Sequence, residues 1–265
     1  MTAPQLNGAQ LEYAIRIRGL TKHFGTQLIF ENLSLDVHAG EILAIAGGSG
    51  TGKSVLLRTI LGLLPFEAGS VEILGSSDFA SLSKTERVKI ERQVGVLFQD
   101  GALFSSLTVL QNVQVPMREH LKLPLKTMDA LALLKIAMVG LPPSAAYKYP
   151  SELSGGMRKR AGLARALALD PRIVFLDEPT SGLDPIGAAA FDRLIQSLQR
   201  TLGLTVYMIT HDLDSIFAVC DRVAVLADKH VVREGAPMDL VRDPGHPWVR
   251  EYFCGERGRQ IAKAS

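Results

Sequence analysis

The feature that most constrains the fold of this chain is residues 47–54, GGSGTGKS, which fit the pattern G-x-x-x-x-G-K-[S/T]. The apolar run EILAIA precedes them at residues 41–46, as expected of a strand buried on both faces of a parallel sheet. We expect a helix to follow from Lys53 to about Leu64, where Pro65 stops it. A strand, a glycine-rich loop and a helix in this order predict a cradle for phosphate groups.

The residue types of this loop suit a nucleoside triphosphate. Glycines allow backbone N–H groups to point into a concave surface without obstruction by Cβ atoms, and the helix N-terminus adds partial positive charge. Lys53 can reach the β- and γ-phosphates, and the hydroxyl of Ser54 can ligate Mg²⁺. We therefore predict that ATP and Mg²⁺ are bound by Gly47, Gly48, Ser49, Gly50, Thr51, Gly52, Lys53, Ser54 and Val55.

A pair of acids forms the second chemical feature. Residues 173–178 read IVFLDE, an apolar strand that ends in two carboxylates. In an open parallel sheet, ligands bind at the carboxyl ends of the strands. We predict that Asp177 holds Mg²⁺ and that Glu178 orients or deprotonates the attacking water. Together with Lys53, they form the expected catalytic centre of an ATPase.

Strands and helices alternate along most of the chain, which predicts an α/β fold with a mainly parallel sheet covered on both faces. Residues 186–199 read as an amphipathic helix with Phe191, Leu194, Ile195 and Leu198 on one face. The strand candidates are residues 12–18, 33–37, 41–46, 70–74, 94–98, 172–176, 205–209 and 222–227.

The middle of the chain has a different pattern. Residues 100–160 contain several prolines and few β-branched runs, and they include a helical spacing at Leu131, Leu134, Lys135 and Met138. We expect a mainly helical subdomain inserted into the α/β core. The predicted division is a domain at 12–243, with its core at 12–99 and 161–243 and the helical subdomain at 100–160, followed by a C-terminal extension at 244–265.

Composition excludes several other classes of protein. The formal net charge of +2 gives no basic face for nucleic acid, so we expect no nucleic-acid partner. Cys220 and Cys254 have no CxxC spacing, which favours a reducing compartment over a disulfide framework. The N-terminal residues lack a signal-peptide pattern, and no apolar run reaches the ~20 residues that span a bilayer. We expect a protein that is soluble by itself and reaches a membrane only through a partner.

Residues 153–157 read LSGGM, and a basic helical pattern follows them. Lying between the glycine-rich loop and IVFLDE, this segment resembles the signature of the ABC transporter ATPase family, which usually reads LSGGQ. The resemblance implies a homodimer in which Ser154, Gly155 and Gly156 contact the γ-phosphate held by the opposite subunit. Met157 departs from the family pattern, so no glutamine side chain is available there.

Further elements of the family follow in order. The resemblance implies that Gln99 senses the γ-phosphate, contacts the metal and acts in catalysis. It also implies that Asp184 crosses the dimer interface, that His211 is the catalytic switch histidine and that Phe24 stacks on adenine. The resemblance covers about residues 12–240. It implies a RecA-like P-loop core with an inserted α-helical subdomain and an antiparallel β edge near the N-terminus.

Three segments carry a narrower resemblance to the ATPases of Mla-type phospholipid transport systems: residues 98–113, 116–120 and 153–160. It implies a peripheral subunit on the cytoplasmic face of the inner membrane, bound to a permease of the MlaE type. A STAS-domain subunit of the MlaB type and a periplasmic MCE-domain subunit of the MlaD type would complete the system. Its task would be to move phospholipid between the two membranes and maintain outer-membrane lipid asymmetry.

Two other functions stay open. The ATPase could serve another cargo, such as amino acid import or solvent and drug export, because the membrane partner selects the cargo. A non-transport ABC ATPase, as in DNA repair, is the second alternative. It is disfavoured because the segment between Lys53 and Glu152, which are 99 positions apart (152 − 53), lacks long heptad repeats.

Two surfaces also carry hypotheses. Residues 100–120, with Leu103, Phe104 and Leu107, could form the groove for the permease's coupling helix or be ordinary subdomain core. The C-terminal extension could dock on the neighbouring ATPase subunit or pack on its own domain. Its apolar anchors, Trp248, Tyr252 and Phe253, lie beyond the expected core, with Arg250, Arg257 and Arg259 nearby, and Gly255 and Gly258 argue against one long helix.

Overall fold

The computed structural model describes residues 11–76, 78–99 and 101–264. Its central element is a six-stranded sheet with the order β5-β6-β7-β3-β8-β9. All neighbours in it are parallel except β8 and β9, which pair antiparallel at one edge. The strands are β3 (Ile42–Ala46), β5 (Val94–Leu97), β6 (Ile173–Asp177), β7 (Thr205–Ile209), β8 (Arg222–Ala227) and β9 (His230–Gly235). The expected mainly parallel sheet is confirmed.

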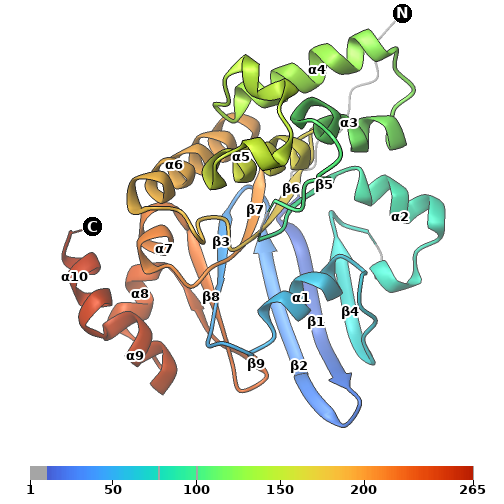
Figure 1. Cartoon of the computed structure of the whole chain (residues 1–265). Coiled ribbons are helices and arrows are strands. Elements are labelled where there is room, and N and C mark those ends of the chain that lie inside the picture. Colours follow the sequence, from blue (N-terminus) through green and yellow to red (C-terminus); the bar gives the residue numbers. More distant parts are fainter. Residues whose placement is uncertain (1–10, 77, 100, 265) are drawn as a thin grey trace, which may run out of the picture.

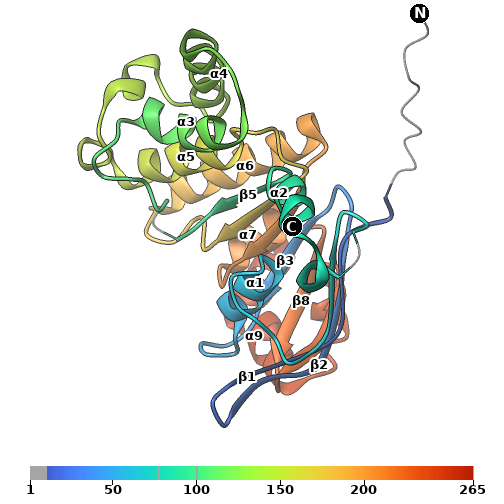
Figure 2. The same cartoon turned by 90° about the vertical axis from the view of Figure 1, so that its right-hand side faces the viewer.

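A second, three-stranded antiparallel sheet has the order β2-β1-β4. Its strands are β1 (Tyr13–Phe24), β2 (Gln27–His38) and β4 (Ala68–Ile73). β1 and β2 form a long hairpin, seen as the blue ribbons that run down to the bottom of Figure 2. This sheet is the N-terminal antiparallel edge that the family resemblance implies.

Helices cover the sheets, and those of the green and yellow middle segment gather at one end of the molecule (Figures 1 and 2). Of the 3₁₀ turns in the described residues, Phe79–Ser81 lies between β4 and α2, and Pro143–Tyr147 and Pro150–Glu152 lie between α4 and α5. The α-helices of the described chain are α1 (Lys53–Ile60), α2 (Lys84–Glu91), α3 (Val109–His120), α4 (Leu125–Met138), α5 (Gly155–Ala166), α6 (Pro185–Leu202), α7 (Leu213–Val219), α8 (Pro237–Arg242), α9 (Pro247–Cys254) and α10 (Glu256–Ala264).

The predicted end of α1 is wrong by four residues, because the helix ends at Ile60 instead of Leu64. Gly62 adopts a left-handed conformation with φ of 69°, and the N–H of Leu63 donates to the carbonyl of Arg58 at 2.8 Å. This pattern is a Schellman ending, in which a glycine stops the helix and satisfies its last carbonyls. The glycine therefore ends α1 before Pro65 is reached.

The helical subdomain consists of α3, α4 and the start of α5. The face expected for α4 is wrong in part: Leu134 is 54% exposed, whereas Met128, Ala132 and Ile136 form the buried face. Lys135 is buried and ion-pairs with Asp170. Helix α5 runs through the boundary expected at residue 160, so core and subdomain share one continuous helix.

Two hydrophobic cores lie on opposite faces of the six-stranded sheet. Along β3 the side chains alternate between them: Ile42 and Ala44 belong to one core, and Leu43 and Ile45 to the other. The first core also contains residues of α3 to α7, and the second contains residues of α1 and the three-stranded sheet. This double burial explains why the central strands read as continuous apolar runs.

On α6, Phe191, Ile195 and Leu198 are buried and Leu194 is partly buried, as predicted.

The C-terminal extension is part of this packing. Val249 and Phe253 are fully buried in the first core, so the expectation that Phe253 lies outside the core is wrong. In the structure the C-terminal extension packs on its own domain, which is the second of the two alternatives. Gly255 separates α9 from α10, as its poor helix propensity predicted. None of the helices formed by the described residues has the length and apolar surface that a bilayer-spanning segment needs.

Candidate functional site

The candidate site lies where four neighbouring strands end. β5, β6, β7 and β3 are parallel, so their carboxyl ends meet at one edge of the sheet (Figure 1). In that order they deliver Gln99, Asp177 with Glu178, His211, and the phosphate loop at residues 47–54. Residues far apart in sequence therefore follow one another along one edge, the place where open α/β sheets bind ligands.

The phosphate loop has a backbone that only glycine accommodates. Gly52, before the first turn of α1, has φ of 96°, and a Cβ atom there would lie 2.8 Å from the ring of Phe30. A Cβ atom on Gly47 would lie 2.4 Å from the carbonyl oxygen of Leu226. Lys53 Nζ donates to the carbonyls of Gly47 and Gly48, each at 2.8 Å. The ammonium group is thus held across the loop, where a phosphate can replace the two carbonyls.

The charges of the site influence one another. Burial lowers the pKa of Lys53, and the carboxylates of Glu178 and Asp177 oppose that shift. Burial also raises the pKa of Asp177, with a further contribution from the neighbouring charge of Glu178, while Arg58 and Lys53 lower it. Desolvation disfavours each charged form, so a bound cation or phosphate that restores charge balance is favoured here.

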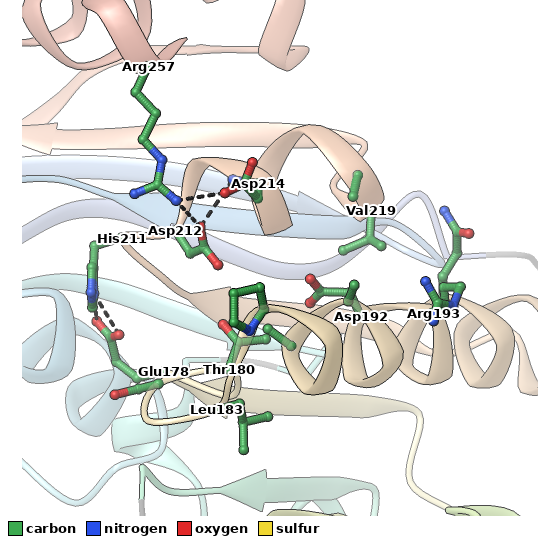
Figure 3. Close-up of a pocket in the computed structure, with 16 residues that line it drawn as sticks. Glu178, Thr180, Leu183, Asp192, Arg193, His211, Asp212, Asp214, Val219 and Arg257 are labelled. Atoms are coloured by element: carbon green, nitrogen blue, oxygen red, sulfur yellow. Dashed lines mark hydrogen bonds and ion pairs between the residues drawn. The ribbon is translucent and has the colours of Figure 1, made fainter. Parts of the chain in front are cut away.

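The side chains of Glu178 and His211 are in direct hydrogen-bond contact across the ends of β6 and β7 (Figure 3). His211 Nδ1 lies 2.6 Å from Oε2 and 2.8 Å from Oε1 of Glu178. The imidazole is 68% exposed, whereas the carboxylate is 17% exposed. A half-buried carboxylate next to an exposed imidazole can accept hydrogen bonds from both the histidine and a water molecule in the site.

The backbone of Glu178 is strained and firmly held. Its φ of 52° is left-handed, which is uncommon for a residue with a Cβ atom. Its N–H donates to the carbonyl of Ile209 at 2.9 Å, and its carbonyl accepts from Nζ of Lys159 at 2.8 Å. Such strain persists only where the surroundings impose it, and it occurs often at functional sites.

Other predicted residues lie at the ends of helices. Ser154 is the N-cap of α5 and is exposed, with its hydroxyl accepting from the N–H of Met157. Gly155 and Gly156 form the first turn of α5, and a Cβ atom added at either glycine would lie more than 3.4 Å from its nearest neighbours. The side chain of Met157 packs against the first core. Asp184 is the N-cap of α6, accepting from Gly187.

The remaining predicted residues are accessible. Phe24 stands at the tip of the β1–β2 hairpin and is 47% exposed, with Lys22 Nζ 5.1 Å from the ring centre. An exposed aromatic face of this kind is available for stacking. Gln99 is exposed in the turn after β5, Ser49 and Gly50 are exposed, and Thr51, Ser54 and Val55 are half-buried.

The structure brings only some of the predicted residues together. Lys53, Asp177, Glu178 and His211 interact by charge or hydrogen bond. Within the described residues, no hydrogen bond or ion pair links Ser154 to the phosphate loop. A cavity of about 690 Å³ lies beside Glu178, between α6 and α7, and touches the loop that leads to Asp184 (Figure 3). It shares only Glu178 and His211 with the predicted nucleotide site, so it is a neighbouring cavity.

The oxygen atoms of the site suit Mg²⁺. Ser54, Asp177 and Gln99 offer a hydroxyl, a carboxylate and an amide oxygen, the hard donors that this ion prefers. Among the described residues, no group of three His, Cys, Asp or Glu side chains could hold a metal by itself. Mg²⁺ is commonly held by one or two carboxylates together with water and phosphate oxygens, so the residues present fit it.

Three residues near the site have no motif of their own. Lys159 reaches Glu178 from α5, Tyr252 Oη donates to the carbonyl of His211 at 2.7 Å, and Arg257 pairs with Asp212 and Asp214 beside it. The basic pattern after LSGGM contained Lys159 without indicating its partner. Tyr252 and Arg257 are about 40 residues from their partners, a separation that no periodic pattern reveals.

Comparisons with known proteins identify the family of this chain. The family model "ABC transporter" matches residues 30–181. The protein named "Probable ribonucleotide transport ATP-binding protein mkl", from Mycobacterium leprae, is 43% identical over 92% of this chain and 70% of its own length. "Intermembrane phospholipid transport system ATP-binding protein MlaF" from Haemophilus influenzae is 40% identical over 86% of each chain. Its Escherichia coli counterpart is 39% identical over 87% of this chain and 85% of its own.

Solved structures show the same fold. The ATP-binding cassette MJ0796, determined as a dimer in a post-hydrolysis state with ADP and Pi, matches with a TM-score of 0.76 at 31% identity. The match covers 84% of this chain and 98% of that one. The cbiO1 subunit of a Clostridium perfringens ABC transporter complex matches with a TM-score of 0.79 at 27% identity, over 96% and 98% of the two chains.

Proposed function

This chain belongs to the ABC transporter family as its ATP-binding and ATP-hydrolysing subunit, and from that premise we propose that it powers a phospholipid transporter. The observation that carries the ATPase part is the order of functional groups along one sheet edge: Gln99, Asp177 with Glu178, His211 and the phosphate loop. The relatives named for intermembrane phospholipid transport, at 39% and 40% identity, support the cargo.

The residues divide the chemistry as follows. The phosphate loop donates N–H groups to the phosphates, and Lys53 leaves its two loop carbonyls for the β- and γ-phosphates. Phe24 stacks on the base. Ser54, Asp177 and Gln99 would hold Mg²⁺, which would supply positive charge to offset that of the phosphates. Glu178 accepts a hydrogen bond from the attacking water, and His211, already paired with Glu178, moves towards the γ-phosphate.

Two copies complete each site. Ser154 is exposed at the start of α5, where free N–H groups and the helix dipole favour an anion. In its own chain it makes no bond to the phosphate loop within the described residues. We therefore propose a homodimer in which residues 154–156 of one copy face the γ-phosphate held by the other, with Asp184 at the interface. The dimer recorded for the similar cassette supports this arrangement.

A permease is the second proposed partner. Two cavities, of about 290 Å³ and 270 Å³, lie beside the edge strand β5, and both are lined by Val94 and Val96. The larger is mainly apolar, whereas charged side chains also line the smaller one, together with Phe104, which is 51% exposed. The larger cavity suits the apolar side chains of a short cytoplasmic helix. Leu103 packs against the first core, so on this proposal Phe104 would contact the permease while Leu103 belongs to the subdomain core.

We extend the proposal to the rest of the system on the likeness to the phospholipid transport ATPases alone. The permease would be of the MlaE type, with a STAS-domain subunit of the MlaB type and an MCE-domain subunit of the MlaD type. The chain would then lie on the cytoplasmic face of the inner membrane, held there by the permease. Its action would maintain lipid asymmetry of the outer membrane.

The cargo is tested by purifying the chain with the permease encoded beside it and identifying the molecules that copurify. We expect phospholipid, and we expect phospholipid vesicles to stimulate ATP hydrolysis by the complex. Ribonucleotide is the competing cargo, because the mycobacterial relative is named for its transport. A complex that retains and responds to ribonucleotides but not to phospholipids would contradict the proposal.

A further inference from the structure

We propose that α9 and α10 form a brace that positions the switch loop, residues 210–212, against the nucleotide site of the same chain. Tyr252 and Arg257 are its positioning residues. The inference rests on the proposed role of His211 in ATP hydrolysis. It concerns a part of the chain that lies outside residues 30–181, the range matched by the family model.

Tyr252 fixes the backbone of the switch histidine. Its hydroxyl donates to the carbonyl oxygen of His211 at 2.7 Å. Burial raises the pKa of the Tyr252 phenol, so that the hydroxyl stays protonated and can donate at neutral pH. The ring is itself held, stacked on Trp248 at 4.6 Å between centroids and edge-on to Phe253 at 5.1 Å. The hydrogen bond therefore comes from a side chain with little freedom to move.

Arg257 forms ion pairs with residues that follow His211. Its Nη2 lies 2.6 Å from Oδ2 of Asp214 and 3.6 Å from Oδ1 of Asp212 (Figure 3). Asp212 is the N-cap of α7 and accepts from the N–H of Asp214 at 3.1 Å. The guanidinium group thus links α10 to the first turn of α7, immediately after the switch histidine.

The brace is anchored to the core and reaches the phosphate loop. Phe253 is fully buried, with its ring 6.2 Å from that of Phe217 on α7. Trp248 lies beside the loop, because its Nε1 is 3.4 Å from the position of a Cβ atom on Gly48. The helices α9 and α10 therefore contact two loops of the nucleotide site, the loop after β3 and the loop after β7.

The side chain of His211 is exposed and pairs with Glu178, while its backbone is held by the brace. The imidazole is 68% exposed, and His211 lines a cavity of about 410 Å³ together with Trp248, Tyr252 and Arg257. A fixed backbone with an exposed imidazole allows the ring to move between Glu178 and the nucleotide from a constant origin. Without the brace, His211 would sample more positions, and fewer of them would be productive.

The experiment compares two brace variants of the full chain with a matched control. Tyr252→Phe removes the hydroxyl and keeps the stack on Trp248, and Arg257→Ala removes the ion pair. Arg259→Ala, an exposed arginine on the same helix, makes the same change in charge without a contact to α7. Each protein is assayed for MgATP affinity, unfolding midpoint and kcat per ATP-binding site.

We expect Tyr252→Phe to lower kcat about three- to tenfold, as the loss of one hydrogen bond to the switch loop implies. Arg257→Ala should lower kcat less, because its ion pair is exposed and screened, and Arg257→Lys should recover part of the loss. MgATP affinity should stay within about twofold, since Lys53 and Ser54 are untouched. Arg259→Ala should match the wild type in every assay.

Unchanged kcat in Tyr252→Phe and Arg257→Ala would overturn the brace, as would a loss of MgATP affinity equal to the loss of kcat. His211→Ala, measured in parallel, separates the two claims. If His211→Ala turns over normally, the proposed role of His211 fails, whatever the brace variants do. If His211→Ala is slow, adding Tyr252→Phe should slow it no further, because the brace acts through residue 211. A further, additive loss would also overturn the brace.

Discussion

Glu178 and His211 hold each other at 2.6 Å, although the chain that joins them runs through a whole helix and strand. This pairing of the two side chains depends on the left-handed backbone of Glu178 and on the hydrogen bond from its N–H to the carbonyl of Ile209. At the residue scale, the centre of the site is the half-buried carboxylate of Glu178, whose position is fixed by backbone and side-chain contacts with β7 and α5. A substitution that keeps the shape of the Glu178 side chain but removes its charge isolates the chemical role of the carboxylate.

Glu178→Gln should retain MgATP binding and lose at least about 100-fold in hydrolysis rate, as expected when a general base is removed. The amide keeps the size of the side chain, so the contact with His211 can persist. Equilibrium nucleotide binding and phosphate release measure the two effects. Lys53→Ala is the contrasting control, since it should weaken binding itself. Turnover by Glu178→Gln at the wild-type rate would remove Glu178 from the mechanism.

Asp192 shows how burial changes a charge near the same site. The side chain is 4% exposed, Oδ2 accepts from Ser215, and Oδ1 has no hydrogen-bond partner among the residues that the structure describes. Burial raises the pKa of Asp192 to about 6, the Ser215 hydrogen bond lowers it, and the charges of Asp212 and Asp214 raise it further while Arg193 lowers it. Because the folded pKa exceeds the unfolded one, this group favours folding below about pH 4, and that contribution is lost as pH rises through 6.

Asp192→Asn should therefore gain stability relative to the wild type as pH rises from 4 to 7.5, by up to about 3 kcal/mol. Amide and carboxylate have similar shapes, so the Ser215 contact can remain. Urea unfolding across this pH range measures the difference. Asp239→Asn, which removes an exposed carboxylate, is the control and should show no such trend. A pH-independent difference between Asp192→Asn and the wild type would contradict the assigned burial effect.

At the element scale, local motifs predicted structure where the cause was local. The strand, loop and helix around residues 41–60 could be predicted because glycines, Lys53 and the apolar run all act within a few residues. The end of α1 was misplaced because Gly62 acts before Pro65. The face of α4 was misassigned in part because Leu134, an apolar residue placed on it by spacing, is exposed, while Lys135 of the same face is buried and pairs with Asp170.

The C-terminal helices could not be predicted from local pattern. Phe253 enters a core built mainly by residues before 241, and Tyr252 meets His211 only in the folded chain. The RecA-like core and the strand-end groups were predictable because parallel strands necessarily end at one edge. The antiparallel sheet came from the family resemblance, since its pairing joins residues such as Ile15 and Ile73.

Trp248 offers a test of how the brace meets the phosphate loop. It is the single tryptophan in the sequence, and it lies beside Gly48. MgATP binding should change its fluorescence in a saturable way, because phosphate enters the loop that the indole touches. Lys53→Ala should lose the change at the same nucleotide concentrations. A wild-type signal that is indifferent to saturating MgATP would show that the indole does not sense the loop.

At the scale of the whole molecule, the described chain contains the two proposed half-sites, and they do not meet. The phosphate loop and Glu178 belong to one, and Ser154 at the exposed start of α5 belongs to the other. A symmetric dimer brings each half-site to its complement twice. Hydrolysis should then depend on association, and defects in opposite half-sites should complement each other.

Mixing Lys53→Ala with Gly155→Glu tests this complementation. Each variant alone should be inactive, whereas a mixed dimer contains one site with an intact loop and an intact signature. After random exchange of equal amounts, activity should recover to at most about a quarter of the wild-type value, because half of the dimers carry one good site of two. Native mass spectrometry confirms that mixed dimers are present. Their presence without any recovered hydrolysis would argue that both half-sites act within one chain.

The most direct measurement is the structure of the Glu178→Gln dimer with MgATP. The account predicts that Oγ of Ser154 in one protomer lies about 3 Å from an oxygen of the γ-phosphate that Lys53 of the other protomer binds. A γ-phosphate surrounded by residues of a single chain, with Ser154 still facing solvent, would contradict it.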